Sequence, residues 1–515
     1  MGCSCDNNIS TKDETNSDNS SLSNLSKNQK IKNHEQILII SEMLVGENKG
    51  NILDYYSVIK TIGEGSFGKV FKVKQKSTGN IFAMKLVSKS TNTHNTNNKN
   101  FLNEIYILKK LDHPNILKIY EYFTNEKNWY FILEYVSGGE LYDKICEMNY
   151  YNENKAAIIM KQILSCISYL HKMNIVHRDI KPENMMLKSK DKDNDLEIKL
   201  IDFGTALQLK KKNKKLTEKV GSPYYMAPEV IKGNYSFEYD VWSCGIIMYI
   251  LLIGYPPFDG KNNKNLYNNI QNNKVDFSGS DWSKISKEAK DLILKLLEKN
   301  PNNRISAFDA LQHPWIKNTN KNIKSNNNFN KISLKNCLQT FSSKQKLHQA
   351  SVAFIVHHMS NSKIVEELTQ IFKELDETGE GLLTINELKK GYKKFFTDDI
   401  SDKEFDEIMK NIDQDKSGQI SIEEFLRATI NYENLISENN LKYAFDYFDK
   451  DHSGFLSKDE IKEVLGLIDD SDESNKIVND IFKEVDLNGD GQISFEEFKI
   501  MMENNQKLIL KNDNE

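Results

Sequence analysis

His177-Arg178-Asp179, followed by Asn184, places together residues that could move a phosphoryl group. The carboxylate of Asp179 is suited to take a hydroxyl proton, and the amide five residues later can reach a metal ion. Phosphoryl transfer needs little covalent chemistry from a protein, because it mainly requires nucleophile, phosphate and magnesium to be held in line. A tripeptide of this kind can arise by chance, so the rest of the chain must decide.

A glycine-rich stretch over residues 62–70 could hold the phosphates of a nucleotide. It reads G-x-G-x-x-G-x-V, and glycines let the backbone approach phosphate oxygens closely. A lone match is weak, but β-type residues on both sides favour a hairpin over the strand-to-helix turn of a dinucleotide fold. The predicted nucleotide contacts are Ile62, Gly63, Glu64, Gly65, Ser66, Phe67, Gly68, Lys69 and Val70.

Lys85 and Glu104 form the next predicted pair. Lys85 ends an apolar strand and should reach the α- and β-phosphates, and Glu104 is its expected ion-pair partner. Taken singly, each could be an ordinary surface charge. We expect a helix over 101–111, with an apolar stripe of Leu102, Ile105, Leu108 and Leu111. The Asn-rich segment 91–100 is expected to be a solvent-exposed loop.

Asp202-Phe203-Gly204 and Ala227-Pro228-Glu229 complete an ordered series of motifs that chance does not supply. Residues 56–316 therefore resemble a eukaryotic protein kinase, and Lys181 resembles its serine/threonine class. The resemblance implies a bilobal α+β fold with ATP and Mg²⁺ as cofactors. It also implies catalytic roles for Asp179, Lys181, Asn184 and Asp202, with Asp179 as base and with Asn184 and Asp202 as magnesium ligands.

Three glutamates carry finer expectations. Glu140 and Glu183 match positions that contact substrate arginines in kinases directed to basic sequences, and carboxylates suit arginine because its planar fork can be met bidentately. Glu218 stands where many kinases carry a phosphothreonine, so we expect it to supply part of that charge near Arg178. Catalysis should then not require phosphorylation of the activation segment, residues 202–229, which contains Glu218.

Four acidic loops near the end of the chain are suited to binding calcium. They begin 36 or 37 residues apart, which is the length of the EF-hand helix–loop–helix repeat. Oxygen ligands at positions one, three, five, seven and twelve surround the ion, the one at seven being a backbone carbonyl, and glycine at six makes a sharp turn. The predicted ligands are Asp376, Thr378, Glu380 and Glu387 in loop one; Asp413, Asp415, Ser417, Gln419 and Glu424 in loop two; Asp449, Asp451, Ser453, Phe455 and Glu460 in loop three; and Asp486, Asn488, Asp490, Gln492 and Glu497 in loop four.

The loops differ in strength and share one structural signal. Thr378 removes a carboxylate and Glu380 is longer than the usual ligand, so loop one should bind calcium more weakly. Position eight is apolar in every loop, which should let loops pair through a short strand. Flanking apolar residues should line grooves that calcium opens, and they are Phe372, Phe425, Phe445, Phe448, Phe482, Phe498, Met501 and Met502.

The N-terminal tail and the composition constrain location. Gly2 is a candidate for myristoylation and Cys3 for palmitoylation, although Asp6 replaces the usual Ser or Thr.

A net charge of −5 on 515 residues gives no reason to expect nucleic acid. The six cysteines form no framework, which favours a reduced, intracellular compartment. We expect a cytoplasmic protein attached to a membrane. The apolar run 244–255 is too short to span a bilayer and predicts a buried helix.

Composition shifts divide the chain into four regions. They are a disordered tail at 1–55, a kinase domain at 56–316, a linker and junction at 317–359, and a calmodulin-like domain at 360–515. Within the junction a basic amphipathic pattern begins at Leu334, which is typical of a calmodulin target and equally of a final scaffold helix.

This order of parts resembles the calcium-dependent protein kinases of plants and protists. The resemblance implies a calcium-activated serine/threonine kinase that its junction inhibits until calcium-loaded EF-hands seize it. Tethering should make free calmodulin unnecessary, and we expect a monomer acting on proteins with basic residues before the phosphosite. Two alternatives remain: a calcium-responsive scaffold with an idle kinase fold, and a kinase under other control with buffering EF-hands. Inhibition by a pseudosubstrate and by helix docking also both stay open.

Overall fold

The computed structural model places secondary structure from Leu44 onward. It describes residues 44–48, 50–65, 68–89, 96–189, 196–210, 214–318, 346–359, 362–396, 402–430, 435–467 and 471–512. The predicted lipidation sites Gly2 and Cys3, the nucleotide-loop residues Ser66 and Phe67, and the junction from 319 to 345 lie outside these described residues.

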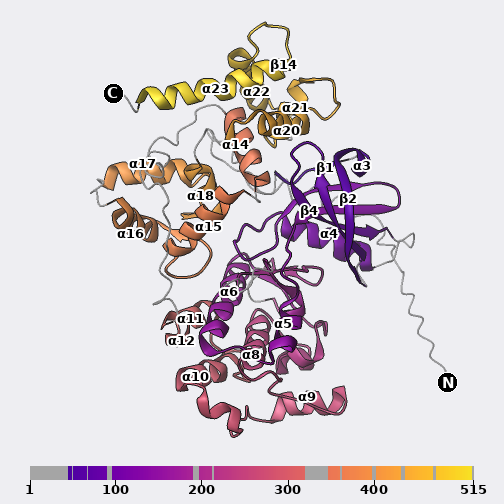
Figure 1. Ribbon diagram of the computed structural model, residues 1–515, viewed down its shortest axis with the longest axis vertical. Helices are drawn as coiled ribbons and strands as arrows, with labels where there is room; N and C mark the ends of the chain where they lie inside the picture. The colour runs from indigo at the N-terminus through magenta and orange to yellow at the C-terminus, as the bar shows by residue number, and fades with distance from the viewer. Residues whose placement is uncertain are drawn as a thin grey trace, which may run out of the picture. The chain divides into compact units, whose positions relative to one another are not determined.

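A six-stranded sheet in the order β1-β5-β6-β4-β3-β2 forms the first part of the predicted kinase domain, and its edge strand β1 precedes residue 56 (Figure 1). Its elements are β1 (Glu47–Asn48), α3 (Ile52–Tyr55), β2 (Tyr56–Gly65), β3 (Gly68–Gln75), β4 (Ile81–Ser88), α4 (Thr96–Leu108), β5 (Ile119–Thr124) and β6 (Asn128–Glu134). Aromatic and branched residues such as Tyr56, Val73 and Phe82 fill one side of the sheet. Ile105 and Leu108 of α4 belong to the main core.

The predicted helix at α4 needs two corrections. Residues 96–100 are helical, so the Asn-rich segment is not a loop throughout. Leu102 is 51% exposed, whereas Ile107, outside the predicted stripe, is fully buried. A helix turns by about 100° per residue, so steps of three drift by about 60° each, and Leu102 falls away from the buried face.

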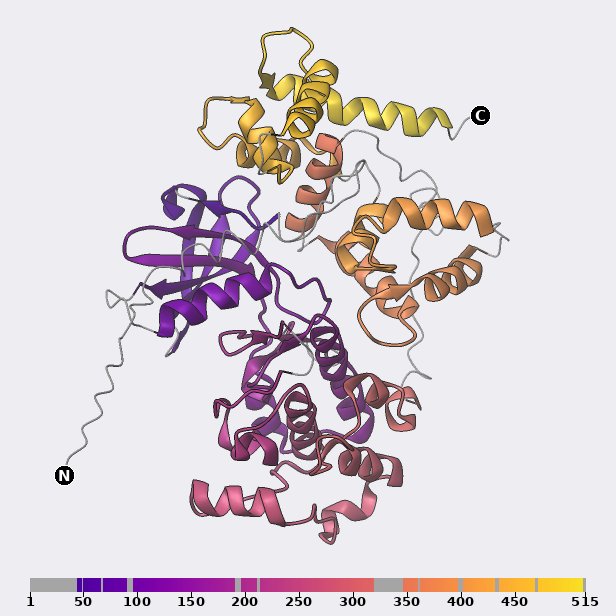
Figure 2. The ribbon, with the colours of Figure 1, turned by 180° about the vertical axis from the view of Figure 1, so that it is seen from behind.

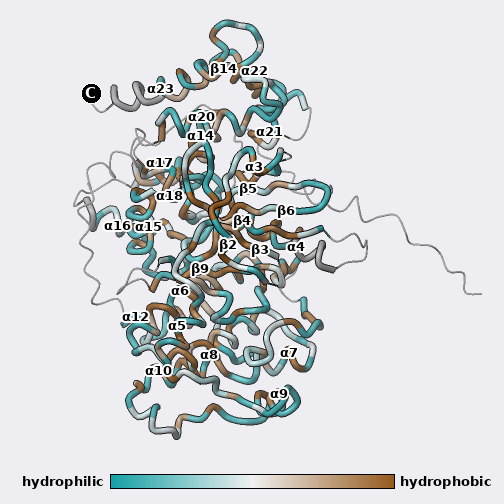
Figure 3. Tube along the Cα trace, turned by 45° about the vertical axis from the view of Figure 1, so that its right-hand side comes forward, coloured by the Kyte–Doolittle hydropathy of each residue, from teal (hydrophilic) through white to brown (hydrophobic). Residues whose placement is uncertain are grey.

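Helices dominate the second part of the predicted kinase domain. The elements are α5 (Leu141–Met148), α6 (Glu153–Lys172), β7 (Ile175–Val176), η1 (Pro182–Asn184), β8 (Met185–Leu187), β9 (Ile198–Leu200), β10 (Leu207–Gln208), η2 (Pro223–Tyr225), α7 (Pro228–Lys232), α8 (Glu238–Ile253), α9 (Asn263–Asn272), η3 (Ser280–Lys284), α10 (Lys287–Leu296), α11 (Ala307–Leu311) and α12 (Pro314–Lys317). Helix α8 is buried along nearly its whole length and strongly apolar (Figure 3). It contains most of the apolar run 244–255, so the prediction of a buried helix there is confirmed. Within the described part, none of the helices has the length and apolar character that crossing a bilayer needs.

Two short β-ribbons join the C-terminal helix–loop–helix units in pairs, the first unit with the second and the third with the fourth (Figure 2). The elements are α14 (Lys346–His358), α15 (Lys363–Leu375), β11 (Leu383–Thr384), α16 (Ile385–Phe396), α17 (Asp402–Ile412), β12 (Gln419–Ile420), α18 (Ile422–Thr429), α20 (Glu438–Phe448), β13 (Phe455–Leu456), α21 (Lys458–Val464), α22 (Asp472–Val485), β14 (Ile493–Ser494) and α23 (Phe495–Asn512). Leu383 pairs with Ile420 and Leu456 with Ile493, which confirms the predicted pairing through position eight.

Candidate active site and calcium loops

Asp179 lies at the centre of a dense hydrogen-bond network between β7 and β8. Its carboxylate is 2.8 Å from Lys181 Nζ and accepts bonds of 3.0 Å from both the backbone N–H and the hydroxyl of Ser222. The Asn184 amide donates to the Asp179 carbonyl and carboxylate at 2.8 and 3.1 Å. Lys181 also donates to Ser222 Oγ at 2.9 Å. The carboxylate is therefore fixed in direction before any substrate arrives.

Asp240 of α8 holds the backbone of this loop. Its carboxylate accepts the N–H groups of His177 and Arg178, each at 2.9 Å. Arg178 has φ +71°, a conformation that costs a non-glycine residue energy and needs such support. Burial raises the pKa of Asp240, but the hydrogen bond from His171 and the charge of that ring outweigh it, so the pKa is lowered. Asp240 therefore positions the backbone of His177 and Arg178, next to Asp179.

Asp202 follows β9, with Phe203 packed behind it. Asp202 has φ +61° and accepts the Gly204 N–H at 3.2 Å. The Phe203 ring is fully buried and meets the His177 ring edge-on, with centroids 4.9 Å apart. Burial lowers the pKa of His177, so this ring is neutral near pH 7. The packing ties the segment of Asp202 to the loop of Asp179.

Lys85 on β4 and Glu104 on α4 form an ion pair of 2.7 Å. Their side chains are 13% and 7% exposed, so water screens the pair weakly. The contact joins α4 to the middle of the sheet. It is the pairing that the sequence spacing predicted.

The glycine-rich stretch is a hairpin of β2 and β3, as predicted, with Gly65 opposite Gly68. Gly68 has φ +126°, and a Cβ there would lie 2.0 Å from the Leu86 carbonyl oxygen, so only glycine fits. Val70 lies opposite Lys85 in the neighbouring strand. Glu64 and Lys69 form an exposed ion pair of 3.1 Å at the tip.

Glu218, in the activation segment that runs from Asp202 to Glu229, contacts Arg178. Arg178 Nη1 lies 3.3 Å from the Glu218 carboxylate, and Arg178 Nε donates to the Thr205 carbonyl at 2.7 Å. The Glu218 side chain is 75% exposed. Farther along, Glu229 and Arg304 form a buried bidentate pair with distances of 2.5 and 3.0 Å.

Glu140 and Glu183 lie in one acidic area. Glu140 occupies the N-cap position of α5 without a side-chain capping bond. It also forms an isolated β-bridge with Met186 of β8, the strand that directly follows the η1 turn that contains Glu183. Burial, followed by the charges of Asp143 and Glu183, raises the pKa of Glu140. A carboxylate such as Glu140, whose pKa is raised by burial and by neighbouring negative charges, gains from a cationic partner.

The four loops share one scaffold of hydrogen bonds. The first aspartate of each loop accepts the N–H of the glycine at position six, at 2.7 Å for Gly381, 3.0 Å for Gly418, 2.8 Å for Gly454 and 2.9 Å for Gly491. All four glycines have φ between 75° and 85°, as the sharp turn requires. The glutamate at position twelve accepts backbone N–H groups of its own loop in every case.

Loops two and three gather three carboxylates each. One oxygen from each of Asp413, Asp415 and Glu424 lies within 4.8 Å of the others, as do those of Asp449, Asp451 and Glu460. Burial and the neighbouring Asp415 raise the pKa of Glu424 to about 7. Loops one and four have Thr378 and Asn488 at position three, and among the described residues their carboxylates do not gather in such a cluster. In loop one, burial raises the pKa of Asp376 to about 6. The weaker calcium affinity expected for loop one stays a prediction.

The junction helix α14 packs against helices of the EF-hand region. Phe354 meets the rings of Tyr447, Phe448 and Tyr443 of α20, with centroids 4.4, 5.3 and 5.4 Å apart. At its end, His357 Nε2 lies 3.2 Å from the carbonyl oxygen of Ile119 at the start of β5. The predicted flanking aromatic and methionine residues of the EF-hands are all buried.

Comparison with known proteins decides the family. The protein kinase domain matches residues 56–316, and the EF-hand domain pair matches residues 365–430 and again 438–503. Calcium-dependent protein kinase 4 of Plasmodium falciparum is 42% identical over 87% of this chain and 86% of its own length. The chain belongs to the calcium-dependent protein kinases. Calcium-dependent protein kinase 5 of the same organism is 37% identical over 90% of the chain and 80% of its own length. Calcium-dependent protein kinase 7 of Oryza sativa is 34% identical over 89% and 83%.

As a member of this family, the protein is a calcium-activated serine/threonine kinase that uses ATP, Mg²⁺ and Ca²⁺. Loops two and three fit calcium, because a hard cation favours several oxygen ligands at one point and relieves the repulsion among Asp413, Asp415 and Glu424. Asn184 and Asp202 offer oxygen atoms of the kind that Mg²⁺ prefers. Lys85 offers a positive charge and the β2–β3 hairpin offers glycine backbone, both of which suit nucleotide phosphates.

Sequence reasoning missed Ser222 and Glu423. Ser222 lies in Gly221-Ser222-Pro223, and its bonds to Asp179 and Lys181 appear only when the chain folds. The acidic residue Glu423 reads as a solvated loop charge but is 1% exposed. Its burial depends on partners far away in sequence, so no local pattern could have indicated it.

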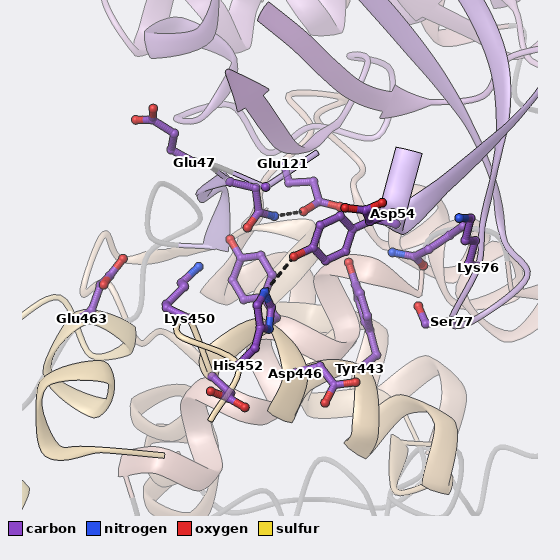
Figure 4. Close-up of a pocket in the computed structure, with 16 residues that line it drawn as sticks. Glu47, Asp54, Lys76, Ser77, Glu121, Tyr443, Asp446, Lys450, His452 and Glu463 are labelled. Carbon is purple, nitrogen blue, oxygen red and sulfur yellow. Dashed lines mark hydrogen bonds between the residues drawn. The ribbon is translucent and has the colours of Figure 1, made fainter. Parts of the chain in front are cut away.

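A cavity of about 390 Å³ lies away from the catalytic loop (Figure 4). Tyr443, Lys450 and His452 line it together with Glu121 and the segment before β2. The Tyr55 hydroxyl is 2.9 Å from His452 Nε2, and Asn48 donates to the Glu121 carboxylate at 2.5 Å. The first of these contacts ties loop three to α3, which directly precedes β2.

Proposed function

We propose that the kinase domain transfers phosphate with Asp179 as base and is held inactive by its junction until calcium binds. Asp179 accepts the proton of the substrate hydroxyl, and its fixed direction supports this role. Lys181 offsets charge beside it, and Lys85, positioned by Glu104, holds nucleotide phosphates. Asn184 and Asp202 would hold magnesium, which neutralises phosphate charge.

The observation that carries the regulatory part is the aromatic contact of α14. Phe354 packs among Tyr443, Tyr447 and Phe448 of α20, the helix that leads into loop three. EF-hands that grip an apolar anchor on the junction would withdraw it from the catalytic domain. Because sensor and target share one chain, free calmodulin is not needed, and the protein acts as a monomer.

Phe354→Ala tests this grip. Loss of the anchor should raise the calcium concentration needed for half-maximal phosphate transfer by about tenfold, as loss of a buried aromatic commonly weakens an interface by 1 kcal/mol or more. Phe308→Ala is a matched control, since Phe308 is 42% exposed on α11. Equal calcium dependence in both variants would remove the junction from the mechanism.

The substrate class follows from Glu140 and Glu183. Burial and the charges of Asp143 and Glu183 raise the pKa of Glu140, which supports a site for an arginine just before the phosphorylated Ser or Thr. Glu140→Gln should raise KM for an arginine-containing peptide and leave KM for a neutral peptide unchanged. A KM that rises equally for both peptides would refute the assignment.

The location is proposed from the tail. Myristate on Gly2 and palmitate on Cys3 would together anchor the protein on the cytoplasmic face of a membrane, since one chain alone binds only marginally. In a fractionation experiment Gly2→Ala should move the protein into the soluble fraction. Unchanged membrane association would refute the lipid anchor.

A further inference from the structure

Glu423 occupies position eleven of calcium loop two, next to the bidentate ligand Glu424. Its side chain is buried, whereas the same position in the other loops holds Asn386, Asp459 and Glu496, all exposed. A carboxylate removed from water must be compensated by charge and hydrogen bonds. Loop two therefore differs from the other three loops because its position-eleven side chain is buried against other parts of the protein.

The partners of Glu423 come from the kinase domain and from the junction. Lys118 Nζ lies 2.6 Å from Glu423 Oε1, and the Glu423 backbone N–H donates to Asp112 at 2.8 Å. His357 of α14 lies between the same carboxylate and the Ile119 carbonyl oxygen. Glu423, which is next to a calcium ligand, thus contacts both the junction helix α14 and the kinase domain.

A second route joins Glu423 to the calcium ligand itself. Arg427 lies one helical turn farther along α18, with Nη2 3.7 Å from the Glu423 carboxylate. Its Nη1 donates to the Gln414 side chain at 2.9 Å, and the Gln414 backbone N–H donates to Glu424 at 2.9 Å. A shift of Glu424 on binding calcium would therefore displace Glu423, both through the shared backbone and through the side chains of Arg427 and Gln414.

The contacted kinase segment is close to the catalytic pair in the chain. Asp112 and Lys118 lie in the connection between α4, which carries Glu104, and β5. Holding that connection fixes the end of the helix that pairs with Lys85. The contact can therefore stabilise the arrangement needed for catalysis and not only the position of the EF-hands.

We propose that Glu423 is a positioning residue that couples calcium loop two to the kinase domain through Lys118 and Asp112. The coupling deepens, and rests on, the calcium control proposed above. Thermodynamic linkage makes it reciprocal, because contact with Lys118 must raise the calcium affinity of loop two by the factor by which calcium favours that contact. A kinase-domain residue then tunes one calcium site.

Calorimetric calcium titration of the full chain tests this. Glu387, Glu460 and Glu497 are changed to Gln so that loop two is the intact loop, and Lys118→Met is compared with Lys144→Met. Lys144 pairs with Glu147 on the exposed face of α5. Lys118→Met should weaken calcium binding about tenfold, within the usual range for allosteric coupling, and Lys144→Met less than about twofold. Equal affinity in the two variants would overturn the proposal.

A second comparison covers the case in which Lys118→Met fails to fold, as judged by thermal unfolding. Glu423→Gln and Glu496→Gln make the same change at the same loop position, one buried and one exposed. Only Glu423→Gln should raise the calcium needed for half-maximal phosphate transfer, and equal effects would refute the coupling. If the unmodified protein showed equal transfer with calcium and with chelator, calcium control would fail, while the binding comparison would still decide the coupling.

Discussion

Glu218 should contribute to activity as a fixed negative charge, but modestly. Its carboxylate lies 3.3 Å from Arg178, and the side chain is 75% exposed. Exposed ion pairs contribute about 0.2–1 kcal/mol, and that range corresponds to a factor of about 1.4 to 5 in rate. Arg178 keeps its bonds to the Thr205 carbonyl and to Asp240 when Glu218 is removed, so the catalytic loop should not collapse.

The perturbation is Glu218→Ala, measured as kcat/KM for a basic peptide at saturating calcium after phosphatase treatment. We expect a two- to fivefold loss, within the range worked above, and this difference should shrink in 0.5 M salt because ions screen exposed charges. Glu288→Ala, an exposed carboxylate on α10, is the control. An unchanged kcat/KM would refute the idea that Glu218 replaces a phosphate. A loss beyond about a hundredfold would contradict the magnitude expected for an exposed pair.

Other predictions concern the active site, the calcium loops and acid stability. Ser222→Ala should lower kcat about tenfold or more, since hydrogen bonds to charged groups contribute about 1.5–3 kcal/mol. Ser222→Thr keeps the hydroxyl and should retain most activity. Equal kcat in the unmodified protein and both variants would show that Ser222 has no role in the active site. Changing Glu424, Glu460 and Glu497 to Gln should raise the calcium needed for half-maximal activity, because each supplies the bidentate ligand; an unmoved activation curve would contradict their assignment. Burial lowers the pKa of His113 to about 3, below its unfolded value near 6.5. The neutral ring thus contributes stability above about pH 6.5 that is lost as pH falls toward 3, by about 1.4 kcal/mol per pH unit. His113→Asn should therefore reduce the fall in melting temperature between pH 6.5 and 4.5, and an unchanged slope would contradict this assignment.

Residues that act over short sequence distances were predictable from the chain alone. The hairpin of the glycine-rich stretch followed from β-type residues on both sides, and the pairing of Leu383 with Ile420 followed from the apolar position eight. The Lys85–Glu104 contact followed from the order of motifs and is present at 2.7 Å. In each case local periodicity or a fixed motif spacing carries the information.

Properties set by distant partners were not predictable in this way. Leu102 was expected in the core, but the rotation of α4 is set by the burial of Glu104 and Ile107 against the rest of the domain. Ser222 gains its role from Asp179, which it meets only in the folded chain. Glu423 is an unremarkable acidic residue until Lys118 and His357 surround it.

Phosphate transfer by the full chain to a basic peptide, measured with calcium and with a chelator, tests the central claim most directly. The claim is that catalysis is built in at Asp179 and that calcium controls access to it. We expect transfer with calcium and a fall to a small residual rate with chelator. No transfer with calcium would indicate a scaffold with an idle kinase fold, and equal transfer under both conditions would contradict calcium control.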